Sequence, residues 1–141
     1  MTDAANSFPY PLPEYGAEAF WDACNEERLV MQQCRDCGTY RWHPAPVCGN
    51  CGSLNYEWVT LSGRGKVHTW SVVTHPVHPA AVKKVPYVVV VVELAEQEGL
   101  TMISNLIGSE PDNIAFGQAV EVVFESHPSG QKLPQFRAIS G

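Results

Sequence analysis

The sequence predicts a mainly β protein, in which an N-terminal helix and a zinc ribbon precede a five-stranded barrel of the OB-fold type. Two Cys-x2-Cys pairs separated by ten residues predict the ribbon. Five strand-like segments after residue 63 predict the barrel. With 141 residues, 45% of them hydrophobic, the chain has enough apolar side chains for one compact domain or two small domains that share an interface.

The beginning of the chain predicts an extended arm and then one short helix. Residues 1–13 are polar and contain three prolines, which is typical of an extended segment. Over residues 17–27 the apolar residues Phe20, Trp21 and Cys24 alternate with acidic residues at a helical spacing, so we expect a short amphipathic helix. The acidic neighbours of Cys24 disfavour a reactive thiolate, and we expect a small core residue there.

The most specific local motif is the set of four cysteines Cys34, Cys37, Cys48 and Cys51. Each Cys-x2-Cys turn brings two sulfurs to one metal ion at roughly 2.3 Å, and two such turns complete the coordination sphere of a structural zinc site. Because protein ligands fill all four positions, no place is left for a zinc-bound water, and we do not expect hydrolytic zinc chemistry. The flanking segments 29–33, 39–43 and 56–60 predict the short strands of a ribbon.

Two other interpretations of the cysteines are weaker. Disulfides or a redox dithiol would suit a small disulfide scaffold or a thioredoxin-like βαβ unit, and the long apolar strands and the missing βαβ pattern disfavour both. His43 lies between the two pairs and is an alternative ligand. The sequence Trp42-His43-Pro44 is explained more simply as packing around the site.

A glycine-containing stretch at 62–65 divides the chain, so we expect the helix and ribbon over 14–62 and the barrel over 63–141. The longer connection before the fourth predicted strand favours an OB-type barrel, and the alternative β-sandwich usually has more strands. The segment 87–92 is apolar at every position, which predicts cover on both of its faces. The five predicted strands cover residues 66–74, 85–94, 100–107, 119–125 and 135–139.

The charge balance limits the classes of function. Fifteen acidic and nine basic residues give a net charge of −6, whereas nucleic-acid-binding proteins normally present a basic face to the phosphates. The chain also shows no secretory pattern at its start and no apolar run near the 18 residues of a membrane span. With cysteines explained by metal, we expect a protein of the reducing cytoplasm.

Two clusters outside the ribbon contain candidate contact residues. Arg64 and Lys66 alternate with glycines at the start of a predicted strand, where they are placed to meet a phosphate, although a flexible hinge between domains is the simpler interpretation. The second cluster is a proline-containing loop, for which an ordinary solvent loop is the alternative to a metal, substrate or partner site. Its candidate residues are His75, His78, Lys83 and Lys84. The sequence shows no catalytic motif, and we assign no catalytic residue.

Several motifs, taken in order, resemble one known family. The set is similar to the acyl-CoA-associated OB-fold family with an N-terminal rubredoxin-like zinc ribbon, over about residues 14–139. The cysteine spacing alone is shared with many ribbons, whereas the ordered set is far more specific. Its members here are Phe20-Trp21, Arg28-Leu29, the two cysteine pairs, Leu61-Ser62-Gly63-Arg64-Gly65, Pro86-Tyr87 before a valine-rich strand, and Leu133-Pro134-Gln135-Phe136.

The resemblance implies a small, non-catalytic subunit whose large partner carries the catalytic residues. Members of this family occur with thiolase-like proteins, including retro-aldolases, and with MaoC-like enoyl-CoA hydratases. We therefore expect a cytoplasmic accessory subunit of a thiolase-type complex that acts on an aromatic or sterol-derived acyl-CoA, with one structural zinc per chain. The candidate contacts with CoA or with the partner are Arg64, Lys66, His75, His78, Lys83 and Lys84.

Three alternative functions stay open at this point. The first is an accessory subunit of a MaoC-like hydratase, and the second is independent hydrolysis of acyl-CoA. The third is a single-stranded nucleic-acid-binding OB module, for which Trp70, Tyr87 and Phe124 supply stacking aromatics. Its weakness is the missing basic groove.

Overall fold

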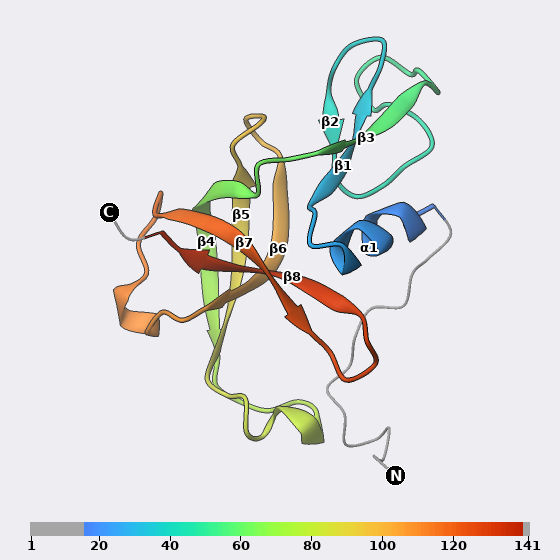
Figure 1. The fold of residues 1–141 in the computed structure, drawn as a ribbon. Helices are drawn as coiled ribbons and strands as arrows, with labels where there is room; N and C mark the ends of the chain where they lie inside the picture. The colour runs from blue at the N-terminus through green and yellow to red at the C-terminus, as the bar shows by residue number, and fades with distance from the viewer. Residues whose placement is uncertain (1–15, 140–141) are drawn as a thin grey trace.

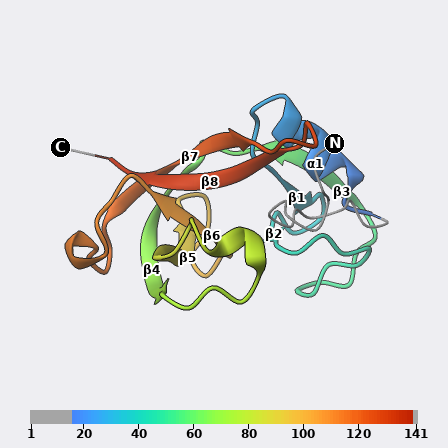
Figure 2. The ribbon, with the colours of Figure 1, turned by 90° about the horizontal axis from the view of Figure 1, so that it is seen from below.

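A computed structural model describes residues 16–139, which form one α-helix, a three-stranded ribbon and a closed five-stranded barrel (Figures 1 and 2). The arm predicted for residues 1–13 lies outside the described residues. The helix and ribbon strands are α1 (Glu18–Asn25), β1 (Val30–Cys34), β2 (Tyr40–Arg41) and β3 (Tyr56–Thr60). The barrel strands are β4 (Arg64–Val73), β5 (Tyr87–Leu94), β6 (Thr101–Ile107), β7 (Ala119–Ser126) and β8 (Lys132–Ala138).

The barrel closes in the strand order β4-β5-β6-β8-β7, with β7 pairing back onto β4. The pairing of β6 with β8 is parallel, and the other barrel pairings are antiparallel. Closure satisfies the backbone groups that an open sheet leaves at its edges. The predicted OB-type fold is therefore confirmed, and the β-sandwich alternative is wrong.

Strand β5 corrects one expectation about burial. Its side chains alternate: Val90 and Val92 are fully buried, whereas Val89 and Val91 are half-buried. A closed barrel has one interior, so even an all-valine strand turns every second side chain outward. The inner face of the segment is covered as expected, whereas its outer face is covered only in part, and Ile103, the neighbour of Val91 on β6, is 69% exposed.

The segment around Gly65 is paired with a strand on each side in the barrel wall, so its interpretation as a flexible hinge is wrong. Gly65 is paired with Leu94 on one side and with Val120 on the other. The backbone N–H of Val122 donates to the carbonyl of Gly63 at 2.7 Å. Strand pairing on both sides leaves this stretch no hinge freedom.

Replacing Gly65 with alanine is expected to lower the free energy of unfolding by about 1–3 kcal/mol, the usual cost of overpacking. A Cβ at this position would lie 2.5 Å from the carbonyl oxygen of Glu93 and 2.7 Å from Cγ1 of Val92. Urea unfolding measures the change. Gly49→Ala is the matched control, since nothing lies within 4 Å of a Cβ there. If the two variants had the same free energy of unfolding, the strands around Gly65 would be shown to move apart enough to accommodate a methyl group.

Helix α1 ties the ribbon to the barrel, and it lies beside β1 and β8 (Figure 1). Phe20 is fully buried and its ring centroid lies 4.5 Å from that of Trp42, which follows β2. At the other end of the helix, the side-chain oxygen of Asn25 accepts a hydrogen bond from the backbone N–H of Lys132 at 2.8 Å. The predicted helix is confirmed, and its apolar face belongs to a core shared by both parts.

The hairpin between β5 and β6 makes a second connection to the ribbon. The side-chain oxygen of Gln97 accepts from the backbone N–H of Tyr40 at 2.9 Å, and its amide nitrogen donates to the carbonyl of Tyr40 at 3.1 Å. The side-chain amide of Gln97 therefore forms the two hydrogen bonds that the backbone of a neighbouring strand would form with Tyr40 of β2. Together with α1, this contact fixes the ribbon against the barrel.

Candidate metal centre

The two cysteine pairs meet at the tip of the ribbon. The Sγ atoms of the four cysteines all lie within 4.8 Å of one another. The distance is 3.6 Å between Cys34 and Cys51 and also 3.6 Å between Cys37 and Cys48. A tetrahedral zinc ion with Zn–S bonds of about 2.3 Å requires sulfurs about 3.8 Å apart, so the four thiols fit one zinc ion.

Each pair is shaped by a turn that ends in a glycine. The backbone N–H of Gly38 donates to the carbonyl of Cys34, and that of Gly52 donates to the carbonyl of Cys48, both at 2.9 Å. The φ angles of Gly38 and Gly52 are +79° and +78°. Because this left-handed region favours glycine, the residue that follows each second cysteine allows the chain to turn back beneath the sulfurs.

Hydrogen bonds prepare the thiols for metal binding. The amide of Asn50 donates to Sγ of Cys37 at 3.5 Å, and the Thr39 hydroxyl lies 3.2 Å from the same sulfur. These contacts lower the pKa of Cys37 to about 5. The backbone N–H of Cys37 lowers the pKa of Cys34 in the same way. Since the thiolate is the form that binds zinc, the surroundings of Cys34 and Cys37 favour the ligand state. At Cys51 the backbone N–H of Ser53 acts in the same direction, but the neighbouring cysteine thiols and burial outweigh it and raise the pKa of Cys51 to about 12.

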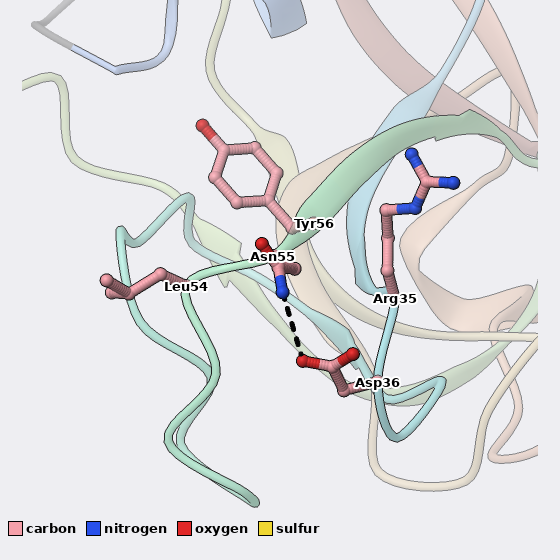
Figure 3. A pocket seen from close by; sticks show the side chains of 5 residues that line it. All are labelled: Arg35, Asp36, Leu54, Asn55 and Tyr56. Atoms are coloured by element: carbon pink, nitrogen blue, oxygen red, sulfur yellow. Dashed lines mark hydrogen bonds between the residues drawn. The ribbon is translucent and has the colours of Figure 1, made fainter.

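A carboxylate links the two knuckles from outside the sulfur cluster. Asp36 accepts hydrogen bonds from the hydroxyl of Ser53 and, at 3.3 Å, from the amide of Asn55, as Figure 3 shows for the latter. The Ser53 and Asn55 hydrogen bonds lower the pKa of Asp36. Leu54 and Tyr56 stand at the rim of the same shallow hollow. With its one carboxylate already engaged, the hollow offers no general base.

The alternative cysteine interpretations do not fit this geometry. A disulfide requires sulfurs about 2.05 Å apart, and none of the five cysteines is bonded to another. His43 stacks on Trp42 with ring centroids 4.8 Å apart, and it is not in the ligand cluster found among residues 16–139. Cys24 is fully buried in the core, as expected, and burial raises its pKa to about 12.

The other candidate contact residues lie at two separate places. Arg64 and Lys66 are exposed at the start of β4, where Nζ of Lys66 lies 3.3 Å from a carboxylate oxygen of Glu93. The loop that carries His75, His78, Lys83 and Lys84 follows the end of the same strand. The ten residues of β4 span roughly 30 Å at about 3.3 Å per residue. The structure therefore does not bring the two clusters together in one site.

Sequence reasoning missed the residues that support the metal site. Asn50 and Thr39 bond to Cys37, and Ser53 bonds to Asp36. Their signal in the sequence is weak, because small polar residues are common in any turn. Their positions between or beside the cysteines are the one indication that a second layer of hydrogen bonds surrounds the sulfurs.

Within residues 16–139 no helix has the length and apolar character that crossing a membrane requires.

Two domain models match consecutive parts of the chain. The rubredoxin-like zinc ribbon domain of ChsH2 matches residues 21–57, and the C-terminal OB-fold domain of ChsH2 matches residues 58–125. The ribbon model agrees with the four-cysteine cluster. The chain thus contains a rubredoxin-like zinc ribbon with ligands for one structural zinc ion.

Similar curated proteins are of two kinds. A DUF35 domain-containing scaffold protein of Pyrococcus furiosus is 35% identical over 105 residues, which cover 74% of each chain. A probable enoyl-CoA hydratase alpha subunit of Thermomonospora curvata is 41% identical over 120 residues, which cover 84% of this chain and 36% of that protein. The 3-oxo-4,17-pregnadiene-20-carboxyl-CoA hydratase alpha subunit of Mycobacterium tuberculosis is 33% identical over 77% of this chain and 33% of its own length. The chain thus spans about one third of each hydratase subunit.

Solved structures give the same fold. A chain of the Ltp2-ChsH2(DUF35) aldolase is 36% identical and superposes with a TM-score of 0.82, covering 92% of this chain and 98% of that one. A DUF35-family protein of unknown function from Sulfolobus solfataricus superposes with a TM-score of 0.60 at 13% identity, covering 88% of this chain and 85% of that one, a likeness that shows the fold alone.

Proposed function

The chain belongs to the ChsH2 family of DUF35 proteins, and from this membership we propose that it is the non-catalytic, zinc-binding subunit of a thiolase-type acyl-CoA enzyme complex. The observation that carries the proposal is the match to the Ltp2-ChsH2(DUF35) aldolase, in which nearly the whole of the related chain is covered. That structure is named as an aldolase with two components, Ltp2 and ChsH2(DUF35). We assign the same kind of partner to this protein.

The proposed reaction is cleavage of, or acyl transfer from, an aromatic or sterol-derived β-keto acyl-CoA by the partner. One relative, the hydratase of Mycobacterium tuberculosis, is named for a pregnadiene carboxyl-CoA, which supports a sterol-derived acyl group. This chain would support assembly and complete the acyl-CoA entrance. We place the complex in the reducing cytoplasm, because zinc binding requires free thiolates.

Zinc has a structural role in this proposal. Cys34, Cys37, Cys48 and Cys51 would hold the ion, and a four-thiolate site has no open position for substrate or water. The ion would fix the fold of the ribbon and thereby the surface that the ribbon presents to a partner. Arg64, exposed near the ribbon end of β4, is the candidate contact for a CoA phosphate, since Lys66 already pairs with Glu93.

Independent acyl-CoA hydrolysis lacks a supporting constellation among the described residues. Nδ1 of His127 lies 2.9 Å from the hydroxyl of Ser129, which superficially resembles a nucleophile and its base. The backbone N–H of Ser129 donates to the same Nδ1 at 3.0 Å, and both residues lie in the exposed turn between β7 and β8. The pair therefore closes a turn and does not activate a nucleophile.

A second candidate function is supported by the hydratase names. This chain corresponds to about one third of two hydratase alpha subunits, at 41% and 33% identity. An accessory role beside a MaoC-like enoyl-CoA hydratase would leave the fold and the zinc site unchanged, and the reaction would become hydration of a double bond.

Mixing the purified chain with candidate catalytic subunits tests the proposal. We expect a stable complex with the Ltp2 subunit of the related aldolase, measured by size-exclusion chromatography with light scattering, and retro-aldol activity that the chain raises. The chain alone should release no CoA from acyl-CoA substrates. If the chain formed a complex with a MaoC-type hydratase and not with Ltp2, the reaction of the complex would be hydration, as in the second candidate function. Turnover by the chain alone would overturn the non-catalytic role.

A further inference from the structure

The loop between β4 and β5, residues 74–86, projects from the end of the barrel opposite the ribbon (Figure 1). Two of its side chains are apolar and open to solvent: Val77 is 85% exposed and Val82 is 60% exposed. Single exposed apolar side chains are common on protein surfaces, so the two valines matter here because they lie five residues apart on one projecting loop. The β4–β5 loop therefore has the surface character of a contact element.

The β4–β5 loop is held in one shape by its own contacts. Nδ1 of His78 accepts a hydrogen bond from the backbone N–H of Ala80 at 3.0 Å, which caps a 3-10 turn, η2 (Pro79–Ala81). The carbonyl of Ala81 then accepts from the backbone N–H groups of Lys84 at 2.9 Å and of Val85 at 3.1 Å. The side chain of Ala81 is buried, which anchors the turn. A loop ordered in advance loses less conformational entropy when it binds.

The charge of this region differs from that of the rest of the chain. The β4–β5 loop, residues 74–86, contains Lys83 and Lys84 and no aspartate or glutamate. The whole chain nevertheless has a net charge of −6. The loop thus presents a locally positive end on an acidic protein, which is complementary to an acidic surface.

We propose that the β4–β5 loop is a docking element that inserts Val77 and Val82 into an apolar groove with an acidic rim on the thiolase-type catalytic subunit. This inference rests on the proposed function and adds the surface through which the complex forms. The valines would supply the buried contact, and Lys83 beside Val82 would pair with the rim. In such an arrangement the apolar contacts set the dissociation rate, while the lysine speeds the encounter.

Other occupants fit the loop less well. Two copies of the chain would bring like charges together at this loop. An anionic membrane would attract the lysines, but the exposed apolar part consists of two valines without an aromatic residue, which is a weak anchor, and the chain as a whole is acidic. CoA alone would use the cations and leave the exposed valines uncovered.

The test measures binding of full-length variants to immobilised Ltp2 subunit of the related aldolase at low and high salt. Val77→Ala combined with Val82→Ala should weaken binding by about tenfold, chiefly through faster dissociation. Lys83→Gln should slow association by about threefold at low salt and reduce its salt dependence. Leu54→Ala is the matched control, because Leu54 is 70% exposed on the ribbon and lies outside the loop. It should bind like the unmodified chain.

The outcomes separate the two proposals. If the unmodified chain binds and the two-valine variant binds equally well, the docking inference is wrong while the proposed function stands. If the unmodified chain fails to bind, both the proposed function and the docking inference are wrong. If Leu54→Ala lowered the affinity for Ltp2 more than the two-valine change did, the interface would lie on the ribbon and the inference would be wrong. Loop-dependent binding to vesicles with 30% anionic phospholipid, without loop-dependent binding to Ltp2, would also overturn it.

Discussion

Replacing Cys37 with serine is expected to abolish zinc binding and unfold the ribbon. The sulfur of Cys37 lies 3.6 Å from that of Cys48 and belongs to a cluster that fits a single ion. Structural zinc contributes on the order of 10 kcal/mol to the folding of such small modules, so a ribbon without metal should not hold its shape. The proposed complex with a catalytic subunit should then fail to assemble. Metal analysis of the purified variant and circular dichroism measure the two effects.

Cys24→Ala is the control for this experiment. Cys24 is buried in the core and lies outside the ligand cluster of the described residues, so this variant should retain one zinc ion per chain. A Cys37→Ser variant that still bound its partner and lost only turnover would contradict the structural role and place the metal in the chemistry. Retention of full zinc content would instead identify a different ligand set.

The metal site could be predicted from the sequence because its ligands are local. Two cysteines in one turn and two in the next fix four positions, and only the meeting of the two turns depends on the ribbon. The number of barrel strands and the approximate strand positions followed from β-rich segments between turn signals. Strand β3 spans Tyr56–Thr60, the range that the sequence predicted.

What could not be predicted depends on register between distant strands. Gly65 resembles a hinge residue in sequence, but its pairing with Leu94 and Val120 makes it part of the barrel wall. Nothing near Gln97 in sequence indicates that its amide bonds to Tyr40, 57 residues away. The alternating burial of β5 is invisible in a run of valines, because the pattern that normally reveals alternation requires polar residues on one face.

These contacts also explain how the ribbon and the barrel are held together as one unit. A bound zinc ion would fix the ribbon, Gln97 connects the ribbon to the β5–β6 hairpin, and α1 contacts both β1 of the ribbon and β8 of the barrel. A partner that touched both the ribbon and the barrel would meet a rigid surface. Ordering of that surface before binding lowers the entropy cost of association.

Replacing Phe20 with alanine is expected to destabilise the connection between the two parts. Phe20 is fully buried, and its ring centroid lies 4.5 Å from that of Trp42 and 4.9 Å from that of Trp21. Removing the ring leaves a cavity in the shared core, which costs about 3–5 kcal/mol. Urea unfolding followed by tryptophan fluorescence should show this loss. Because Phe20 joins the ribbon to the barrel, zinc release and barrel unfolding should also separate into two transitions.

Phe116→Ala makes the same substitution on the surface and serves as the control. Phe116 is 73% exposed and contacts Trp70 with ring centroids 4.7 Å apart, so its loss should cost about 0.5–1.5 kcal/mol, the value of an aromatic pair. If both variants lost equal stability, the packing of α1 would not be what couples the parts. If Phe20→Ala unfolded in one transition with zinc released at its midpoint, the coupling would have to come from the Gln97 contact, which a Gln97→Ala variant would then remove.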